Sequence, residues 1–161
     1  MNAAAVAGAD DADTRLAPEL VFAWGNPGRG DDALGPLFIE AVESLRLPGV
    51  ACLTDFQLQV EHALDLVGRR RVLFVDASTN ARSPFELRPL SPKRDASFTS
   101  HAMSPEALLQ VFVDLERRAP PQAWLLAIRG VQWELGQGLS DPARSHLDDA
   151  LAWFRRWLPA G

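Results

Sequence analysis

The chain has 161 residues, of which 47% are hydrophobic and 23% charged, and its formal net charge at pH 7 is −5. Such a length fits one domain with a single core. The acidic balance argues against nucleic-acid binding, because neutralising phosphates requires clustered Lys and Arg. A single cysteine, Cys52, excludes a disulfide scaffold and a multi-cysteine metal site. No apolar run approaches the roughly 20 residues of a bilayer span, so we expect a cytoplasmic protein without membrane contact.

Two regions differ in character. Residues 1–17 are rich in Ala, Asp and Gly, and they carry acids where a secretory signal would be basic, so we expect a disordered tail. Residues 18–161 are expected to form a single α/β domain. Short apolar runs predict strands at residues 20–24, 50–55, 71–77, 85–90 and 123–128. Helical periodicity predicts helices at residues 34–45, 60–67, 104–115 and 141–158.

The alternation of helices with buried strands favours a three-layer α/β/α sandwich with a mostly parallel, twisted sheet of about five strands. Pro89 marks residues 85–90 as an edge strand. Leu115 is expected on the buried face of the third long helix. In the short helix, the expected buried stripe leaves His62 partly exposed beside it and consists of Val60, Ala63, Leu64 and Val67.

Polar side chains follow the predicted strands at three places. A glycine-rich loop that ends in Asp31 and Asp32 follows the first strand, and Asp76 ends the third. His101 lies in a loop directly before a predicted helix. Ligands of open α/β sheets bind beyond the carboxyl ends of the strands, so these residues converge on one edge if the first and third strands are neighbours.

The glycine loop does not match a phosphate-binding motif. Gly25, Gly28 and Gly30 lack the spacing of G-x-G-x-x-G, and two adjacent carboxylates would repel a pyrophosphate. A purely structural interpretation needs the glycines for positive φ and uses Asp31 or Asp32 as a helix cap. That interpretation accounts for one aspartate and leaves the other unexplained.

Asp32, Asp76 and His101 form a set of two carboxylates and one imidazole. These donors suit a divalent first-row metal, with nickel, zinc, iron and manganese all possible. A nucleophilic hydrolase is disfavoured, because no G-x-S-x-G elbow is present and Cys52 lies inside a predicted strand. We therefore expect insensitivity to serine- and cysteine-directed inhibitors.

The sequence resembles the hydrogenase maturation proteases, which are endopeptidases of nickel-hydrogenase assembly, from about Leu20 to Leu158. The resemblance depends on three motifs in this order: Gly25-Asn26-x-x-x-Gly30-Asp31-Asp32-x-x-Gly35-Pro36, then Phe74-Val75-Asp76-Ala77, then Ser100-His101. Many members carry Asp-Gly-Gly-Thr after the second strand. This chain departs from that pattern, with bulkier side chains at residues 55–59.

The resemblance implies an aspartic-type, metal-assisted endopeptidase that removes the C-terminal extension of a hydrogenase large-subunit precursor after nickel insertion. Asp32, Asp76 and His101 are implied as the catalytic and nickel-contacting residues. Nickel is implied to belong to the substrate, and no organic cofactor is expected. We also expect Asn26, Gln57 and Gln59 to contact the substrate peptide.

Two rival functions remain open from the sequence. The Gly25-Asn26-Pro27-Gly28 turn is also similar to the opening of bacterial peptidyl-tRNA hydrolases, but the chain has no Tyr and its first histidine is His62. A maturation chaperone or docking protein that binds the precursor without cleaving it is the non-enzymatic alternative. The sequence leaves the oligomeric state and the hydrogenase class unspecified.

Overall fold

The computed structural model describes residues 17–94 and 103–160. One sheet has the strand order β2-β1-β3-β5-β4. Four strands are parallel and the edge strand β4 is antiparallel to β5. The strands are β1 (Glu19–Trp24), β2 (Val50–Asp55), β3 (Arg71–Ser78), β4 (Phe85–Leu90) and β5 (Gln122–Arg129). The predicted neighbourhood of the first and third strands is confirmed.

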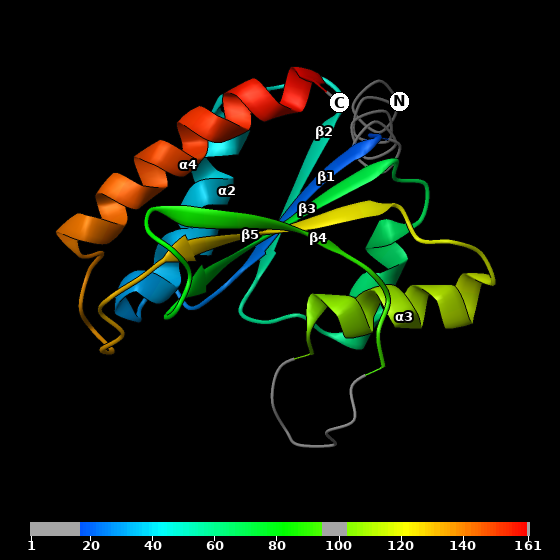
Figure 1. Ribbon diagram of the computed structural model, residues 1–161, viewed down its shortest axis with the longest axis horizontal. Helices are drawn as coiled ribbons and strands as arrows, with labels where there is room; N and C mark the ends of the chain where they lie inside the picture. The colour runs from blue at the N-terminus through cyan, green and yellow to red at the C-terminus, as the bar shows by residue number, and fades with distance from the viewer. Residues whose placement is uncertain (1–16, 95–102, 161) are drawn as a thin grey trace, which may run out of the picture.

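Helices cover both faces of the sheet, which confirms the predicted three-layer sandwich. Figure 1 shows α2 and α4 on one face and α3 on the other. The helices are α2 (Leu34–Ser44), α3 (Pro105–Glu116) and α4 (Asp141–Ala160), with shorter 3-10 helices η1 (Gly30–Ala33) and η2 (Val60–Leu66). None of these described helices is both long and apolar enough to cross a bilayer.

Alternate side chains of the central strands pack into two separate hydrophobic cores, one on each face of the sheet. Phe22 and Phe74 point toward α3 and η2, and their neighbours Val21 and Leu73 point toward α2 and α4. Because both faces are covered, β1 and β3 are apolar almost throughout, as expected of a parallel sheet. Their first polar side chains on the α3 side therefore come where the strands end, at the candidate site.

The start of α3 follows the predicted capping pattern. The Ser104 Oγ accepts a hydrogen bond from the Ala107 N–H at 3.1 Å, and Pro105 occupies the first turn. The prediction for Leu115 is wrong, because this side chain is 60% exposed. The fully buried side chains of α3 end with Phe112, so its last turn contributes little to the core.

The short helix η2 differs from the predicted stripe. It is a 3-10 helix, with three residues per turn, so Ala63 and Leu66 share its buried face. Val60, Leu64 and Val67 are exposed, which makes their predicted burial wrong. The α-helical period assumed from the sequence placed the apolar face on the wrong side.

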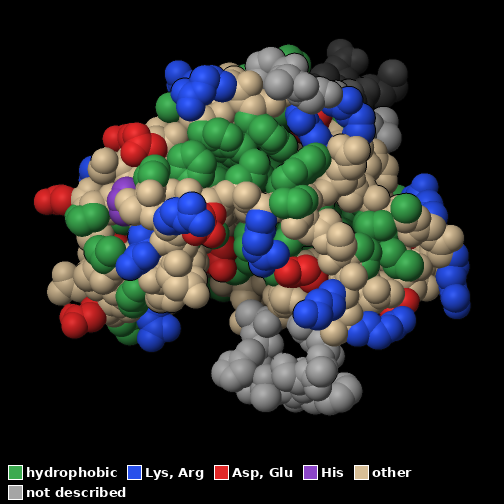
Figure 2. Space-filling view, viewed as in Figure 1, with side chains coloured by type: hydrophobic (Ala, Val, Ile, Leu, Met, Phe, Trp, Pro, Cys, Tyr) green, Lys and Arg blue, Asp and Glu red, His purple; other side chains and the backbone are tan. Residues whose placement is uncertain are grey.

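Aromatic side chains join α4 to the edge of the sheet. Trp153 stacks on Trp157 with ring centroids 5.3 Å apart, and Phe85 of β4 lies 5.8 Å from Trp153. Figure 2 shows hydrophobic side chains gathered on this side of the molecule, between α4 and β4. The tryptophans of α4 are thus partly buried and pack against the core.

We predict opposite effects for two leucines of η2. Replacing the fully buried Leu66 by Ala should lower the free energy of unfolding by about 2 to 5 kcal/mol, because it leaves a cavity. Leu64→Ala is the matched control and should change it by less than about 0.5 kcal/mol, because Leu64 is 65% exposed. Urea denaturation measures both, and equal losses would contradict the 3-10 register.

Candidate functional site

The loop after β1 folds back on itself and brings Asp32 to the end of that strand. Gly25 has φ of 148°, and a Cβ at this position would collide with the Asp32 carbonyl oxygen. The Asn26 N–H donates to the Asp32 carboxylate at 2.7 Å, and the Asn26 side-chain oxygen accepts from the Gly28 N–H at 2.9 Å. Asp32 is therefore held by the backbone that precedes it.

The adjacent Asp31 is completely buried and connects two loops. Its carboxylate accepts hydrogen bonds from the N–H groups of Val131, Gln132 and Ser140 and from the Ser140 hydroxyl, at 2.7 to 3.0 Å. Burial alone would raise the pKa of Asp31, but these hydrogen bonds outweigh it and hold the pKa below its usual value. Asp31 thus has a structural role, and the loop after β5 is fixed against η1.

Asp76 ends the apolar part of β3, next to the end of β1. On the same face of the sheet, the indole N–H of Trp24 donates to the Asp76 carboxylate, as does the Ala77 backbone N–H. The contact from Trp24 was not predicted from the sequence, although its position at the end of the neighbouring strand was the available signal.

The two predicted acids Asp32 and Asp76 influence one another. Burial, and then the negative charge of Asp32, raises the pKa of Asp76 to about 7, against the opposing effect of the two hydrogen bonds. Asp76 therefore exchanges a proton near neutral pH. Perturbed carboxyl groups of this kind cluster at functional sites.

The third predicted member of the set, His101, lies outside the described residues. Within residues 17–94 and 103–160, no group of three His, Cys, Asp or Glu side chains is arranged to hold a metal ion. Asp32 and Asp76 supply two carboxylates, which fit a divalent cation only with a further donor. The set of three thus remains a prediction, and the charge of Asp32 acts on Asp76.

His62, which the sequence predicts to be partly exposed, is paired at the same edge. The side chain of His62 is 13% exposed, and its Nε2 lies 3.2 Å from the carboxylate of Asp55 at the end of β2. Its Nδ1 accepts the Gln59 N–H at 2.9 Å, and its ring lies edge-on to Phe22. The contact with His62 thus holds the Asp55 carboxylate in place at the end of β2.

The predicted substrate-contacting residues occupy different environments. Gln57 and Gln59 are exposed on the connection between β2 and η2, where a peptide can reach them. Asn26 is half-buried and its side chain organises the loop beside Asp32. Their contact with substrate stays a prediction.

The only cysteine is a poor nucleophile. Burial, followed by the charge of Glu43, raises the pKa of the Cys52 thiol to about 12. The thiolate, which is the reactive form, is therefore scarce at neutral pH. This agrees with the expectation that no cysteine nucleophile operates here.

Comparisons with known proteins identify the fold. No protein-family model matches the chain, and no curated protein matches it. Three solved structures are similar at about 20% sequence identity. HycI, a [NiFe] hydrogenase maturation protease from Thermococcus kodakarensis, is 19% identical with a TM-score of 0.66, covering 86% of this chain and 90% of its own.

The other two structures lead to the same result. The hydrogenase maturating endopeptidase HybD from E. coli is 20% identical with a TM-score of 0.65, covering 84% of this chain and 88% of its own. A hydrogenase 2 maturation peptidase from a Thaumarchaeota archaeon is 21% identical with a TM-score of 0.63, covering 89% and 99%. The chain has the fold of the hydrogenase maturation proteases. This confirms the fold that the sequence resemblance implied.

We predict that the Asp76 carboxyl group reduces stability as pH rises. Because its folded pKa of about 7 exceeds the ordinary value of 3.8, the folded state holds a proton that the unfolded state loses between these values. The free energy of unfolding of Asp76→Asn relative to the wild type should therefore rise by about 2 to 3 kcal/mol between pH 5 and pH 8. Denaturation at both pH values measures this difference. The control Glu40→Gln, at an exposed site, should show none.

We predict that the two adjacent aspartates separate into a stabilising and a reactive residue. Asp31→Ala leaves its buried N–H donors without a partner and should cost about 3 kcal/mol or more of unfolding free energy. Asp32→Ala loses the contact to Asn26 but relieves repulsion with Asp76, so its cost should stay within about 1 kcal/mol. Equal losses, measured by urea denaturation, would remove the distinction.

Proposed function

We propose that this protein is a cytoplasmic endopeptidase that removes the C-terminal extension of a [NiFe]-hydrogenase large-subunit precursor after nickel insertion. The supporting observation is the Asp32 and Asp76 pair at the carboxyl edge of the sheet, in the fold of the hydrogenase maturation proteases. The motifs around both acids carry the sequence resemblance to the same proteases. The partner is the precursor polypeptide.

The chemistry proposed for Asp76 follows from its proton affinity. A group with a pKa of about 7 is suited to general acid–base catalysis near neutral pH. While it is not bound to the nickel, it would accept a proton from the water that attacks the scissile carbonyl carbon. As the C–N bond breaks, that proton passes to the leaving amine, so that one water molecule is consumed for each bond cleaved.

Nickel enters this proposal as part of the substrate. Asp32, Asp76 and His101 would contact the nickel ion of the loaded precursor, since two carboxylates and an imidazole suit such a cation. The cation would offset the repulsion between the two carboxylates and could polarise the scissile carbonyl. An unloaded precursor lacks this contact, which provides a physical basis for selecting loaded precursors.

The test is cleavage of the nickel-loaded precursor from the same organism, followed by gel electrophoresis. Asp32→Asn, Asp76→Asn and His101→Ala should each lower the rate by on the order of 100-fold or more, and the control Glu40→Gln should leave it unchanged. Cleavage that persists in all three site variants would reject the site.

The same preparation tests the non-enzymatic alternative. Binding without cleavage by the wild-type protein would instead favour the maturation chaperone or docking protein. None of the three similar structures described above is a peptidyl-tRNA hydrolase, so that alternative gains no support.

A further inference from the structure

Two cavities are lined by β2 and α2, one at each end of the strand, and we call the outer strand edge between them the β2 groove. β2 is the outermost strand of the sheet, with β1 as its one neighbouring strand among the described residues. A cavity of about 280 Å³ lies at the carboxyl end of β2, lined by residues that include Pro36, Thr54 and Phe56. A second cavity of about 220 Å³ lies at the other end, lined by residues that include Glu43, Arg46 and Cys52.

The backbone of β2 has hydrogen-bonding groups along this groove that do not pair with any described strand. At the two ends of the β1–β2 ladder, the carbonyl groups of Gly49 and Asp55 accept the N–H groups of Glu19 and Gly25, each at 3.1 Å. In a parallel ladder, alternate residues face the partner strand, so Ala51, Leu53 and Asp55 face β1. The N–H and C=O groups of Val50, Cys52 and Thr54 consequently face away from the sheet.

One end of the β2 groove lies beside the loop of the candidate site. The cavity at the carboxyl end of β2 is also lined by Gly25 and Pro27, which belong to the loop that holds Asp32. An extended polypeptide that leaves the acid pair along this loop therefore meets the outward backbone groups of Thr54 and then those of Cys52. Proteins use such exposed strand edges to bind extended peptides by strand addition.

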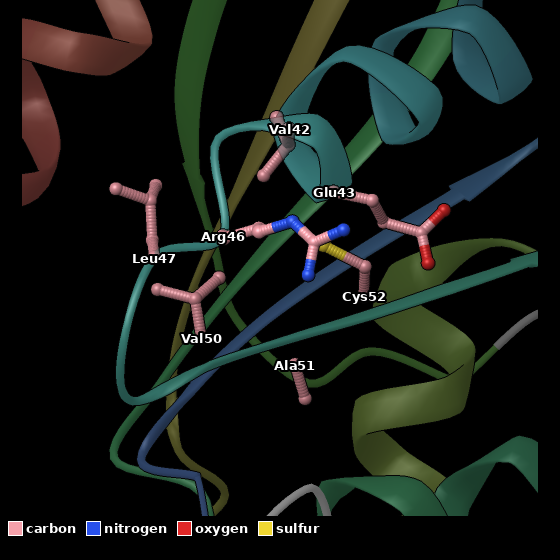
Figure 3. Close-up of a pocket in the computed structure, with 7 residues that line it drawn as sticks. All are labelled: Val42, Glu43, Arg46, Leu47, Val50, Ala51 and Cys52. Atoms are coloured by element: carbon pink, nitrogen blue, oxygen red, sulfur yellow. The ribbon is translucent and has the colours of Figure 1, made fainter.

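The charge at the far end of the groove indicates the chemistry of the occupant. Figure 3 shows the Arg46 side chain extending toward Cys52, with the Glu43 carboxylate lying apart from the guanidinium. Arg46 is exposed and forms no ion pair with any residue that the structure describes. A carboxylate on the bound peptide would complement this guanidinium.

We propose that the segment of substrate polypeptide next to the scissile bond adds to β2 as a further strand and places an acidic side chain on Arg46. This inference rests on the proposed peptidase function and assigns the surface that aligns the substrate. The bound strand would pair with the backbone of Cys52 and Thr54. Sequence selectivity would come from the two cavities, because alternate side chains of an added strand point to the same side.

The first experiment removes one outward N–H group. Thr54→Pro should raise the KM for the nickel-loaded precursor by roughly tenfold with little change in kcat, because it deletes a donor that β1 does not use. Thr54→Ala is the matched comparison: it removes the exposed side chain, keeps the N–H and should raise KM less than Thr54→Pro does. Arg46→Glu should raise KM severalfold. Equal KM values for the two Thr54 variants would overturn strand addition.

The second experiment uses the wild-type chain and does not depend on how a proline variant folds. In hydrogen exchange followed by NMR, the amides of Cys52 and Thr54 should exchange fast in the free protein and become protected when the precursor binds. The amides of Ala51, Leu53 and Asp55 should be protected throughout. Slow exchange at Cys52 and Thr54 in the free protein would show that another part of the chain already occupies the edge, which would overturn the proposal.

The outcomes separate this inference from the proposed function. Cleavage by the wild type, together with unchanged exchange at Cys52 and Thr54 on precursor binding, would overturn strand addition alone. Unchanged KM in Arg46→Glu would overturn the acidic side chain while leaving strand addition supported by Thr54→Pro. Failure of the wild type to cleave or bind the precursor would overturn both proposals.

Discussion

The buried carboxylate of Asp31 is the contact on which the geometry of the candidate site depends. It joins η1 to the loop after β5 through hydrogen bonds from Val131, Gln132 and Ser140. A buried anion is stable only when its lone pairs are satisfied, so neither loop can move without a large cost. Because Asp32 is the next residue, the same contact also fixes the position of the acid whose charge acts on Asp76. The second acid of the candidate site is thus positioned by its neighbour in the sequence.

The candidate site contains an unfavourable electrostatic interaction between two carboxyl groups. Asp76 lies beyond the apolar core of β3, where burial and the charge of Asp32 both oppose its ionisation. Hydrogen bonds from the indole of Trp24 and the N–H of Ala77 offset part of that cost. The resulting pKa of Asp76 is about 7. A residue placed for stability alone would avoid a second carboxylate. This arrangement therefore lowers stability as the pH rises toward the pKa of Asp76.

Much of the fold could be predicted from the sequence, because parallel strands buried on both faces are apolar runs that end abruptly. For that reason the sequence predicted Asp76 after the apolar part of β3, and the glycine loop before Asp32. The division of roles between Asp31 and Asp32 was not, since it depends on a loop about a hundred residues away. The exposure of Val60, Leu64 and Val67 was missed because η2 has a 3-10 period, and a short apolar stretch does not distinguish this from an α-helical one.

Under the proposed function, the acid pair and the β2 groove would recognise different features of the substrate. Two carboxylates that repel each other are stabilised by a cation, so a substrate that carries nickel would bind where an unloaded one would not. Backbone pairing along β2 recognises an extended chain with little regard to its sequence. Neither contact would be sufficient alone, since a cation without a chain offers no bond to cleave and a chain without a cation leaves the repulsion uncompensated. Selectivity for a loaded precursor would then follow from requiring both at once.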